Sequence, residues 1–327
     1  PGQAKDVKDL RLLSKDAAGK ASPIPAQFRE LARWWRGDNS IRWVLVDFAT
    51  EIGAKEGRSF VLTDARAEPP ATALTVKQDE NAITIDTGAA RFVINRKQFN
   101  FIDKAVIDLN GDGKLDDGEN VLASTAECGT VAEDAFGQKY LGSRGTRSVE
   151  VLESGPMRVC VRARGRQLAG EGKGYGPGLY GYDIFLNFYA GSSDVYADVV
   201  ITNNPAKSIG FPGMEDCSLV LKLAGGTSSF ALLGDSDAKA GTGGEGKLAA
   251  GQSYCLYQDS NGAETWEVCS GMGKMETSGW KKLPNQLTSF RGYRIYKRTT
   301  EAMRATTQAD GGGEVVGQGD HARGTLL

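Results

Sequence analysis

The most specific chemical pattern in this sequence lies in the twelve residues 108–119. Side-chain oxygens stand at positions 1, 3, 5, 9 and 12 of this segment, a glycine at position 6 and a backbone carbonyl at position 7. Hard oxygen ligands at these positions match the spacing of a twelve-residue calcium loop. We therefore expect a Ca²⁺ site whose ligands are the side chains of Asp108, Asn110, Asp112, Asp116 and Glu119 and the carbonyl of Lys114.

The flanks of this segment differ from those of a helix–loop–helix calcium sensor. Residues 105–107 before it and 121–122 after it are short apolar runs typical of strand ends, and no second loop exists to pair with it. We expect a structural calcium clip that joins two strands, with an affinity of ~0.1–1 mM as in extracellular modules. The alternative is an Asx-rich turn without an ion, because Asn, Asp and Gly form turns on their own.

Other chemistry is restricted by a single histidine, His321, which leaves tyrosine, lysine, arginine and carboxylates as acid–base groups. Alternation places four arginines on one strand face, and the loop that follows contains lysine and tyrosine. The arginines could neutralise the carboxylate of a uronate sugar, and a tyrosine or lysine could act as the base that deprotonates it. The alternative is an exposed polar face whose arginine stems cover apolar surface. No catalytic residue is assigned. The residues concerned are Arg158, Arg162, Arg164, Arg166, Lys173, Tyr175, Tyr180 and Tyr182.

Aromatic and sulfur-containing residues give two further expectations. Trp266, Trp280 and Tyr293 could stack on sugars, although burial in a core is the alternative. Symmetric folding of a hairpin around residue 262 would place Cys255 opposite Cys269, within reach of a disulfide, with two free thiols as the alternative. None of the five cysteines forms a CxxC pair, which argues against a structural zinc site.

Composition excludes several classes of protein. The 327 residues contain 39 Lys and Arg against 41 Asp and Glu, so the chain does not carry the positive charge of a nucleic-acid binder. No apolar run reaches 18 residues, so we expect no membrane-spanning segment. The 43 glycines favour β-structure with many tight turns.

Alternating apolar and polar residues predict an all-β protein. The runs 157–164, 182–188 and 195–201 predict an antiparallel meander, and further strands are expected at 83–94, 218–223, 252–258, 265–270 and 290–298. Residues 26–35 fit a strand or a helix, and the turn residues at 37–39 favour the strand. We expect a small N-terminal β-domain at 1–70 and a large antiparallel β-sandwich at 71–327, with a glycine-rich tail from 308.

Several segments together resemble one known family. Residues 25–34 and 40–48 resemble the first β-domain of exo-rhamnogalacturonan lyase-like proteins. Residues 85–92 and 153–158 are similar to the second, sandwich domain of that family, and residues 290–296 to its closing strand. The resemblance implies accessory β-domains of a polysaccharide lyase, without the α/α toroid that follows them in the family. It implies no catalytic residue.

Three functions remain open from the sequence. The first is a secreted or cell-surface calcium-binding β-sandwich module that contacts carbohydrate or supports assembly without catalysis, with a polysaccharide as partner. The second is a self-assembling subunit of an extracellular filament or surface layer, joined through its terminal segments. The third is a truncated polysaccharide lyase acting on rhamnogalacturonan-type substrates. The sequence favours the first and leaves enzymatic activity undecided.

Overall fold

The structure is a computed structural model of the chain. It describes residues 2–16, 18–64, 68–134, 136–170, 176–203 and 214–224, and beyond these the backbone of six strands. The chain divides into two compact units, Pro1–Ala224 and Gly225–Leu327. The domain boundary expected after residue 70 stays a prediction.

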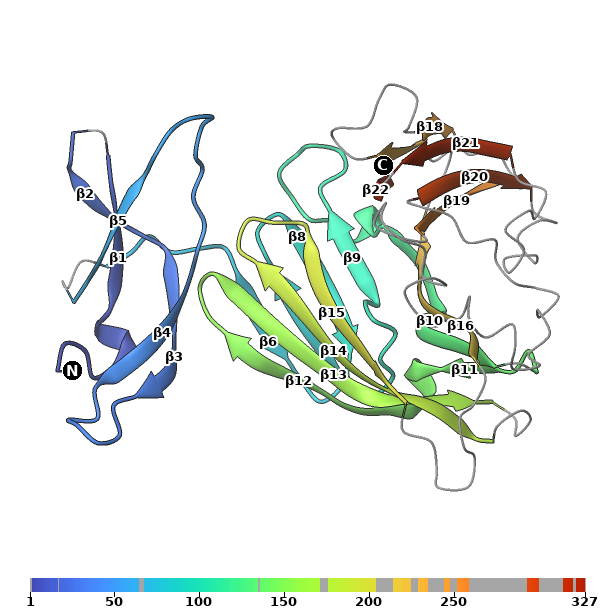
Figure 1. Cartoon of the computed structure of the whole chain (residues 1–327), viewed down its shortest axis with the longest axis horizontal. Helices are drawn as coiled ribbons and strands as arrows, with labels where there is room; N and C mark the ends of the chain where they lie inside the picture. Colours follow the sequence, from blue (N-terminus) through green and yellow to red (C-terminus); the bar gives the residue numbers. More distant parts are fainter. Residues whose placement is uncertain are drawn as a thin grey trace, which may run out of the picture. The chain divides into compact units, whose positions relative to one another are not determined.

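The all-β prediction is confirmed. The described residues contain no α-helix, only short 3₁₀ turns at η1 (Val7–Asp9), η2 (Asp117–Glu119) and η3 (Gly142–Gly145). The first unit comprises small N-terminal sheets, a four-stranded sheet and a large curled antiparallel sheet of seven strands (Figure 1).

The N-terminal strands form two small sheets. Strands β1 (Arg11–Lys15), β2 (Ala21–Ile24) and β5 (Ser59–Thr63) pair in the order β2-β1-β5, while β3 (Ala26–Arg33) and β4 (Ile41–Phe48) form a hairpin. The strand interpretation of residues 26–35 is therefore confirmed for Ala26–Arg33. The hairpin turn is held by Asp38, whose Oδ1 accepts hydrogen bonds from the backbone N–H of Ser40 at 3.1 Å and from its hydroxyl at 2.6 Å. These bonds lower the pKa of Asp38.

Gln27 links this hairpin to the turn before strand β13 (Arg158–Ala169). Its side-chain Oε1 accepts the backbone N–H groups of Met157 at 3.2 Å and Arg158 at 2.9 Å, and its Nε2 donates to Glu153 at 3.0 Å. The amide is buried, and both of its polar atoms have partners, as a buried polar group requires.

The four-stranded sheet is an antiparallel meander. Its strands are β6 (Thr75–Gln78), β7 (Ala82–Asp86), β8 (Ala90–Asn95) and β9 (Lys104–Ile107). Burial alternates along β7 and β8, so Ile83, Ile85, Phe92 and Ile94 point to one face and their polar neighbours to the other.

The seven-stranded sheet contains the predicted meander β13, β14 (Gly178–Tyr189) and β15 (Val195–Thr202), with Ala163 opposite Ile184 and Ile184 opposite Val199. The order continues from β13 to β11 (Lys139–Leu141), β10 (Leu122–Asp134) and β16 (Met214–Leu223), and β12 (Thr146–Ser154) also pairs with β13. The three runs 157–164, 182–188 and 195–201 are therefore confirmed as neighbouring antiparallel strands.

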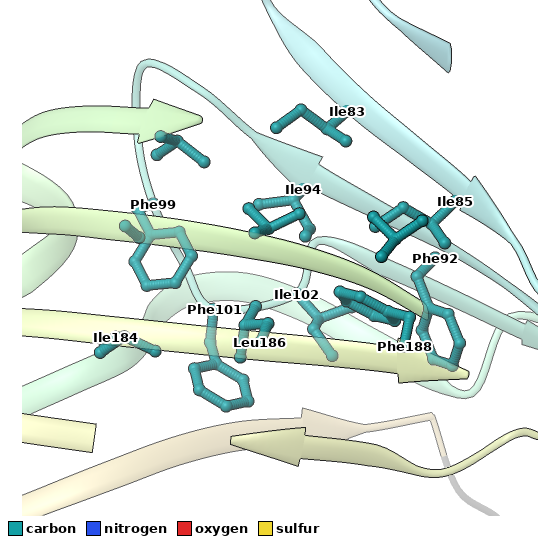
Figure 2. Close-up of a cluster of buried hydrophobic side chains, with 14 of the residues drawn as sticks. Ile83, Ile85, Phe92, Ile94, Phe99, Phe101, Ile102, Ile184, Leu186 and Phe188 are labelled. Atoms are coloured by element: carbon teal, nitrogen blue, oxygen red, sulfur yellow. The ribbon is translucent and has the colours of Figure 1, made fainter. Parts of the chain in front are cut away.

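The main core lies between the four-stranded sheet and the inner face of the large sheet, as a sandwich requires. Figure 2 shows Ile184, Leu186 and Phe188 on one side of this core and isoleucine and phenylalanine side chains of the smaller sheet on the other. The rings of Phe92 and Phe188 lie 5.1 Å apart. Each such side chain contributes roughly 1.5–3 kcal/mol when fully buried, so this layer is a major source of stability.

The second unit holds two three-stranded sheets, in the orders β18-β17-β22 and β19-β20-β21. Their strands are β17 (Ser229–Gly234), β18 (Gly244–Lys247), β19 (Gln252–Gln258), β20 (Tyr293–Thr299), β21 (Glu314–Gly319) and β22 (Ala322–Leu326). Within the glycine-rich tail, β21 pairs with β20 and β22 pairs with β17. The strand expected at 265–270 lies outside the described residues.

Candidate functional site

The predicted calcium loop connects two strands, as its flanks indicated. Strand β9 leads into it at Ile107, and β10 begins at Leu122, after two intervening residues. The two ends are joined by an antiparallel bridge between Val106 and Asn120 and by a hydrogen bond from the N–H of Val121 to the carbonyl of Ala105 at 2.8 Å. The loop of residues 108–119 is therefore closed at its base by sheet hydrogen bonds.

The first half of the loop is wound around Asp108. Its Oδ1 accepts the backbone N–H groups of Gly111 at 2.7 Å and Asp112 at 3.2 Å, and its Oδ2 accepts the N–H of Gly113 at 2.8 Å. Gly113 has a φ of +79°, which favours glycine at this sixth position. The expected sharp turn at position 6 is present.

The second half is held by Glu119, which is only 8% exposed within an otherwise exposed loop. Its Oε1 accepts the backbone N–H groups of Leu109 at 3.0 Å and Asn110 at 3.2 Å, and its Oε2 accepts the N–H of Asp116 at 3.1 Å. One carboxylate thus connects positions 2, 3, 9 and 12 of the loop.

Two further ligand candidates, Asn110 and Asp112, also accept backbone hydrogen bonds through their side chains. Asn110 accepts the N–H of Asp112 at 2.8 Å, and Asp112 accepts the N–H of Lys114 at 2.9 Å. In the part of the chain that the structure describes, no three His, Cys, Asp or Glu side chains are gathered as a metal-binding group. The loop thus has oxygen donors in the order of a calcium loop, while the carboxylates of Asp108, Asp112 and Glu119 accept hydrogen bonds from backbone N–H groups.

Charge and neighbouring strands define the surroundings of the loop. Its five carboxylates and one lysine leave four net negative charges in twelve residues. Asp117, at position 10, pairs outward with Lys104 at 2.6 Å, and the hydrogen bond to Lys104 lowers the pKa of Asp117. Arg91 on β8 donates to the carbonyl of Leu115 at 3.1 Å. The loop is thus attached to the edge of the four-stranded sheet.

Three of the four arginines predicted to share a strand face pair with carboxylates, while Arg166 donates to the backbone carbonyl of Gly178 at 3.2 Å. Arg158 pairs with Glu153 at 2.6 Å and Arg164 with Glu150 at 3.2 Å, while Arg162 forms a two-point pair with Asp183. Hydrogen bonding from Arg162 lowers the pKa of Asp183. These pairs agree with the alternative of a polar sheet face.

The two described tyrosines expected beside these arginines, Tyr180 and Tyr182, are buried. Tyr182 is buried on the core face, where its hydroxyl donates to the carbonyl of Gly142 at 3.2 Å and burial raises its pKa. Tyr180 is buried in a second small cluster. Lys173 and Tyr175 lie outside the described residues.

Two exposed tryptophans, one in the turn of the N-terminal hairpin and one on β4, were not identified as surface residues from the sequence. Trp35 is 76% exposed and Trp43 60% exposed. The guanidinium of Arg36 lies 4.4 Å from the Trp35 ring centre, and that of Arg42 lies 4.5 Å from that of Trp34. The hairpin β3-β4 is a sheet of only two strands, which leaves part of its surface without a covering layer, and no local pattern in the sequence indicates this. The expected stacking residues Trp266 and Trp280 lie outside the described residues, and only the backbone of Tyr293 is described.

The cysteines are partly described. Cys128, Cys160 and Cys217 are free thiols. Cys269 lies outside the described residues, so a disulfide with Cys255 stays a prediction. Cys255 lies on β19, and in the described partner strand β20 the residue opposite it is Tyr296.

Comparison with known proteins adds no assignment. Neither the models of protein families nor the curated proteins match this chain. The resemblance to exo-rhamnogalacturonan lyase-like proteins is therefore still an expectation. Among the described residues, no helix has the length and hydropathy needed to span a membrane.

Proposed function

We propose that this chain is a non-catalytic, calcium-stabilised β-sandwich module that works outside the cell or on its surface and contacts carbohydrate. The observation that carries the proposal is the loop of residues 108–119. It joins two strands, its ends are bridged at Val106 and Asn120, and oxygen donors occupy the six ligand positions of a calcium loop.

Electrostatics supports a divalent cation in this loop. Four net negative charges lie within twelve residues, and hydrogen bonds from backbone N–H groups carry only partial charges to balance them. A bound Ca²⁺ would be held by the side chains of Asp108, Asn110, Asp112, Asp116 and Glu119 and the carbonyl of Lys114. It would supply charge neutralisation and additional closure of the loop. An affinity in the ~0.1–1 mM range suits a calcium-rich exterior.

Three observations favour a module over the alternatives. The ion pairs of Arg158, Arg162 and Arg164 reduce their availability to a uronate carboxylate, which weighs against a truncated polysaccharide lyase. Terminal strands β1 and β22 pair with β5 and β17 of the same chain, which weighs against assembly through the terminal segments. The exposed Trp35 and Trp43 supply flat apolar surface of the kind that interaction sites use.

Calcium titration calorimetry tests the metal part of the proposal. The parent chain is expected to bind one Ca²⁺, and Asp112→Ala is expected to abolish that binding because it removes the ligand at position 5. Asp117→Asn is the matched control, since Asp117 is an acidic residue of the same loop that pairs with Lys104 instead. Equal binding by parent and Asp112→Ala, or no binding by the parent, would refute the calcium proposal.

Polysaccharide assays test the carbohydrate part. Saturable retention on a polysaccharide, without turnover, is the expected result. Release of unsaturated uronate from a rhamnogalacturonan-type polymer would instead identify a lyase. The absence of retention on every polymer tested would refute the carbohydrate contact while leaving the calcium result independent.

Strand β15 gives one observation in favour of self-assembly. In the described part of the large sheet β15 is the terminal strand, and Tyr196, Val199 and Val200 are 62%, 40% and 49% exposed. An exposed apolar edge strand can pair with another chain. Calcium-dependent growth in light scattering that Val200→Lys suppresses would favour the filament or layer subunit, and a monodisperse parent would exclude it.

A further inference from the structure

An open hollow of about 720 Å³ lies at one end of the three-stranded sheet β2-β1-β5. We propose that this hollow binds an acidic saccharide, a sugar that carries a carboxylate or a sulfate, through Lys15, Lys20 and Arg58. The inference rests on the proposed carbohydrate contact, and it specifies both the site and the class of sugar.

The three cations reach the hollow from separate parts of the chain. Lys15 is the last residue of β1, where it lies opposite Ser59 of β5, Lys20 belongs to the turn before β2, and Arg58 directly precedes β5. Among the residues that the structure describes, none of these three side chains forms an ion pair. Their positive charge is therefore available to a ligand.

Arg58 differs in this respect from its neighbours in the N-terminal sheets. Across the described residues 2–64, every other arginine has a carboxylate or an aromatic ring as partner. Arg11, Arg29 and Arg33 pair with carboxylates, and Arg36 and Arg42 lie over tryptophan rings.

The two acidic residues of the hollow are engaged with backbone N–H groups. Asp16 Oδ1 accepts the N–H groups of Ala18 at 3.0 Å and Lys20 at 2.9 Å, and Glu56 Oε2 accepts the N–H of Gly53 at 3.2 Å. These hydrogen bonds fix the turns that precede β2 and β5, and thereby place Lys20 and Arg58. With both carboxylates counted, the lining keeps a net charge of +1, from three cations and two anions.

The remaining lining indicates a polar ligand of intermediate size. Ser14 lies directly opposite Ser22, and with Ser59 these residues offer three hydroxyl groups that donate and accept hydrogen bonds. No large apolar side chain lines the hollow, which disfavours a peptide with apolar anchors. Its volume lies within the ~300–1,000 Å³ range of small-molecule sites, well above what a single inorganic anion fills. A sugar with several hydroxyls and one anionic group satisfies these features.

Affinity electrophoresis tests the inference. A chelator is present, so that Ca²⁺ cannot link the acidic loop to an acidic polymer. The parent is run through gels that contain polygalacturonate, dextran sulfate, neutral dextran or polyglutamate. The test variant is Lys15→Glu with Arg58→Glu, and Lys15→Gln with Arg58→Gln is a milder version should the first fail to fold. The matched control is Lys77→Glu with Arg147→Glu, two exposed cations on β6 and β12.

We expect retardation of the parent by polygalacturonate or dextran sulfate, an affinity loss of about tenfold or more in the charge-reversed variant, and an unchanged control. Whichever acidic polymer retards the parent more strongly identifies carboxylate or sulfate as the preferred group. Equal losses in test and control variants, equal retardation by polyglutamate, or retardation by neutral dextran that the test variant retains would overturn the acidic-saccharide site. Retardation by neutral dextran that the test variant retains would leave the proposed carbohydrate contact intact. No retardation by any polysaccharide would refute both the carbohydrate contact and the acidic-saccharide site.

Discussion

Replacing Glu119 by alanine removes an acceptor that holds together the loop of residues 108–119. Its carboxylate is 8% exposed and accepts three backbone N–H groups, from Leu109, Asn110 and Asp116. A hydrogen bond to a charged group contributes about 1.5–3 kcal/mol. Because Leu109 and Asn110 are exposed, water can replace much of the loss at two of the three donors. We therefore expect Glu119→Ala to lower the free energy of unfolding by ~2–3 kcal/mol without calcium.

Added calcium is expected to produce a second difference in stability between the parent and Glu119→Ala, which can be measured separately. For a site of ~0.1–1 mM, about 10 mM Ca²⁺ stabilises the parent by ~1.4–2.7 kcal/mol. Glu119→Ala should lose this increment as well as the basal stability, because the same carboxylate supplies the ligand at position 12. Thermal unfolding with excess chelator and with calcium measures both quantities in one series.

Asp117→Asn serves as the control for this experiment. Asp117 belongs to the same loop, but its carboxylate pairs with Lys104, so this variant is expected to keep the calcium increment. An equal increment in parent and Glu119→Ala would refute the role of Glu119 in metal binding. Unchanged stability of Glu119→Ala in chelator would refute the structural reasoning from its three hydrogen bonds.

Three other predictions concern the packing of the sheets, an ion pair on the large sheet and the link from the N-terminal hairpin to the large sheet. Phe188 is fully buried in the main core, so Phe188→Ala is expected to cost ~3–5 kcal/mol in chemical denaturation, and a cost below ~1 kcal/mol would contradict the packing of the two sheets. Arg162 lowers the pKa of Asp183, so this pair stabilises the fold above the unfolded-state pKa of ~3.9 and loses that contribution as the pH falls below it. Asp183→Asn should cost ~0.5–1 kcal/mol near neutral pH and flatten the acid limb in urea titrations, whereas unchanged acid limbs would contradict the pair. Gln27→Ala should lower the free energy of unfolding by ~1–3 kcal/mol because it leaves two backbone N–H groups without an acceptor. Gln27→Glu should lower it more, because the new carboxylate would face that of Glu153. Equal urea midpoints for parent and Gln27→Ala would contradict this link.

Local sequence patterns predicted the strands well, because a strand's inward and outward residues alternate with a period of two. The alternation around Ile184 identified three consecutive strands and their antiparallel order, and the turn residues 37–39 decided correctly between strand and helix for the segment before them. The glycine-rich segment after residue 308 holds β21 and β22, which pair with strands of the same unit, and composition alone does not indicate these pairings.

The candidate sites also differ in how far the sequence alone could predict them. The order of oxygen donors in residues 108–119 is contiguous in the chain, so the sequence alone was sufficient to identify the loop and to expect strands on both sides of it. The partners of Arg162 and Arg164 lie on neighbouring strands, and no local pattern indicates that carboxylates would occupy them.

Local spacing determined the β-class, the meander and the position of the loop between two strands, because each depends on residues that are close in the chain. Tertiary structure alone decided which surfaces remain free. Trp35 and Trp43 are exposed because their hairpin has only two strands, and Lys15, Lys20 and Arg58 share a hollow because β1 pairs with both β2 and β5. Whether a side chain is exposed, and which distant side chains lie beside it, depends on how remote parts of the chain pack together. Spacing along the sequence does not specify this packing.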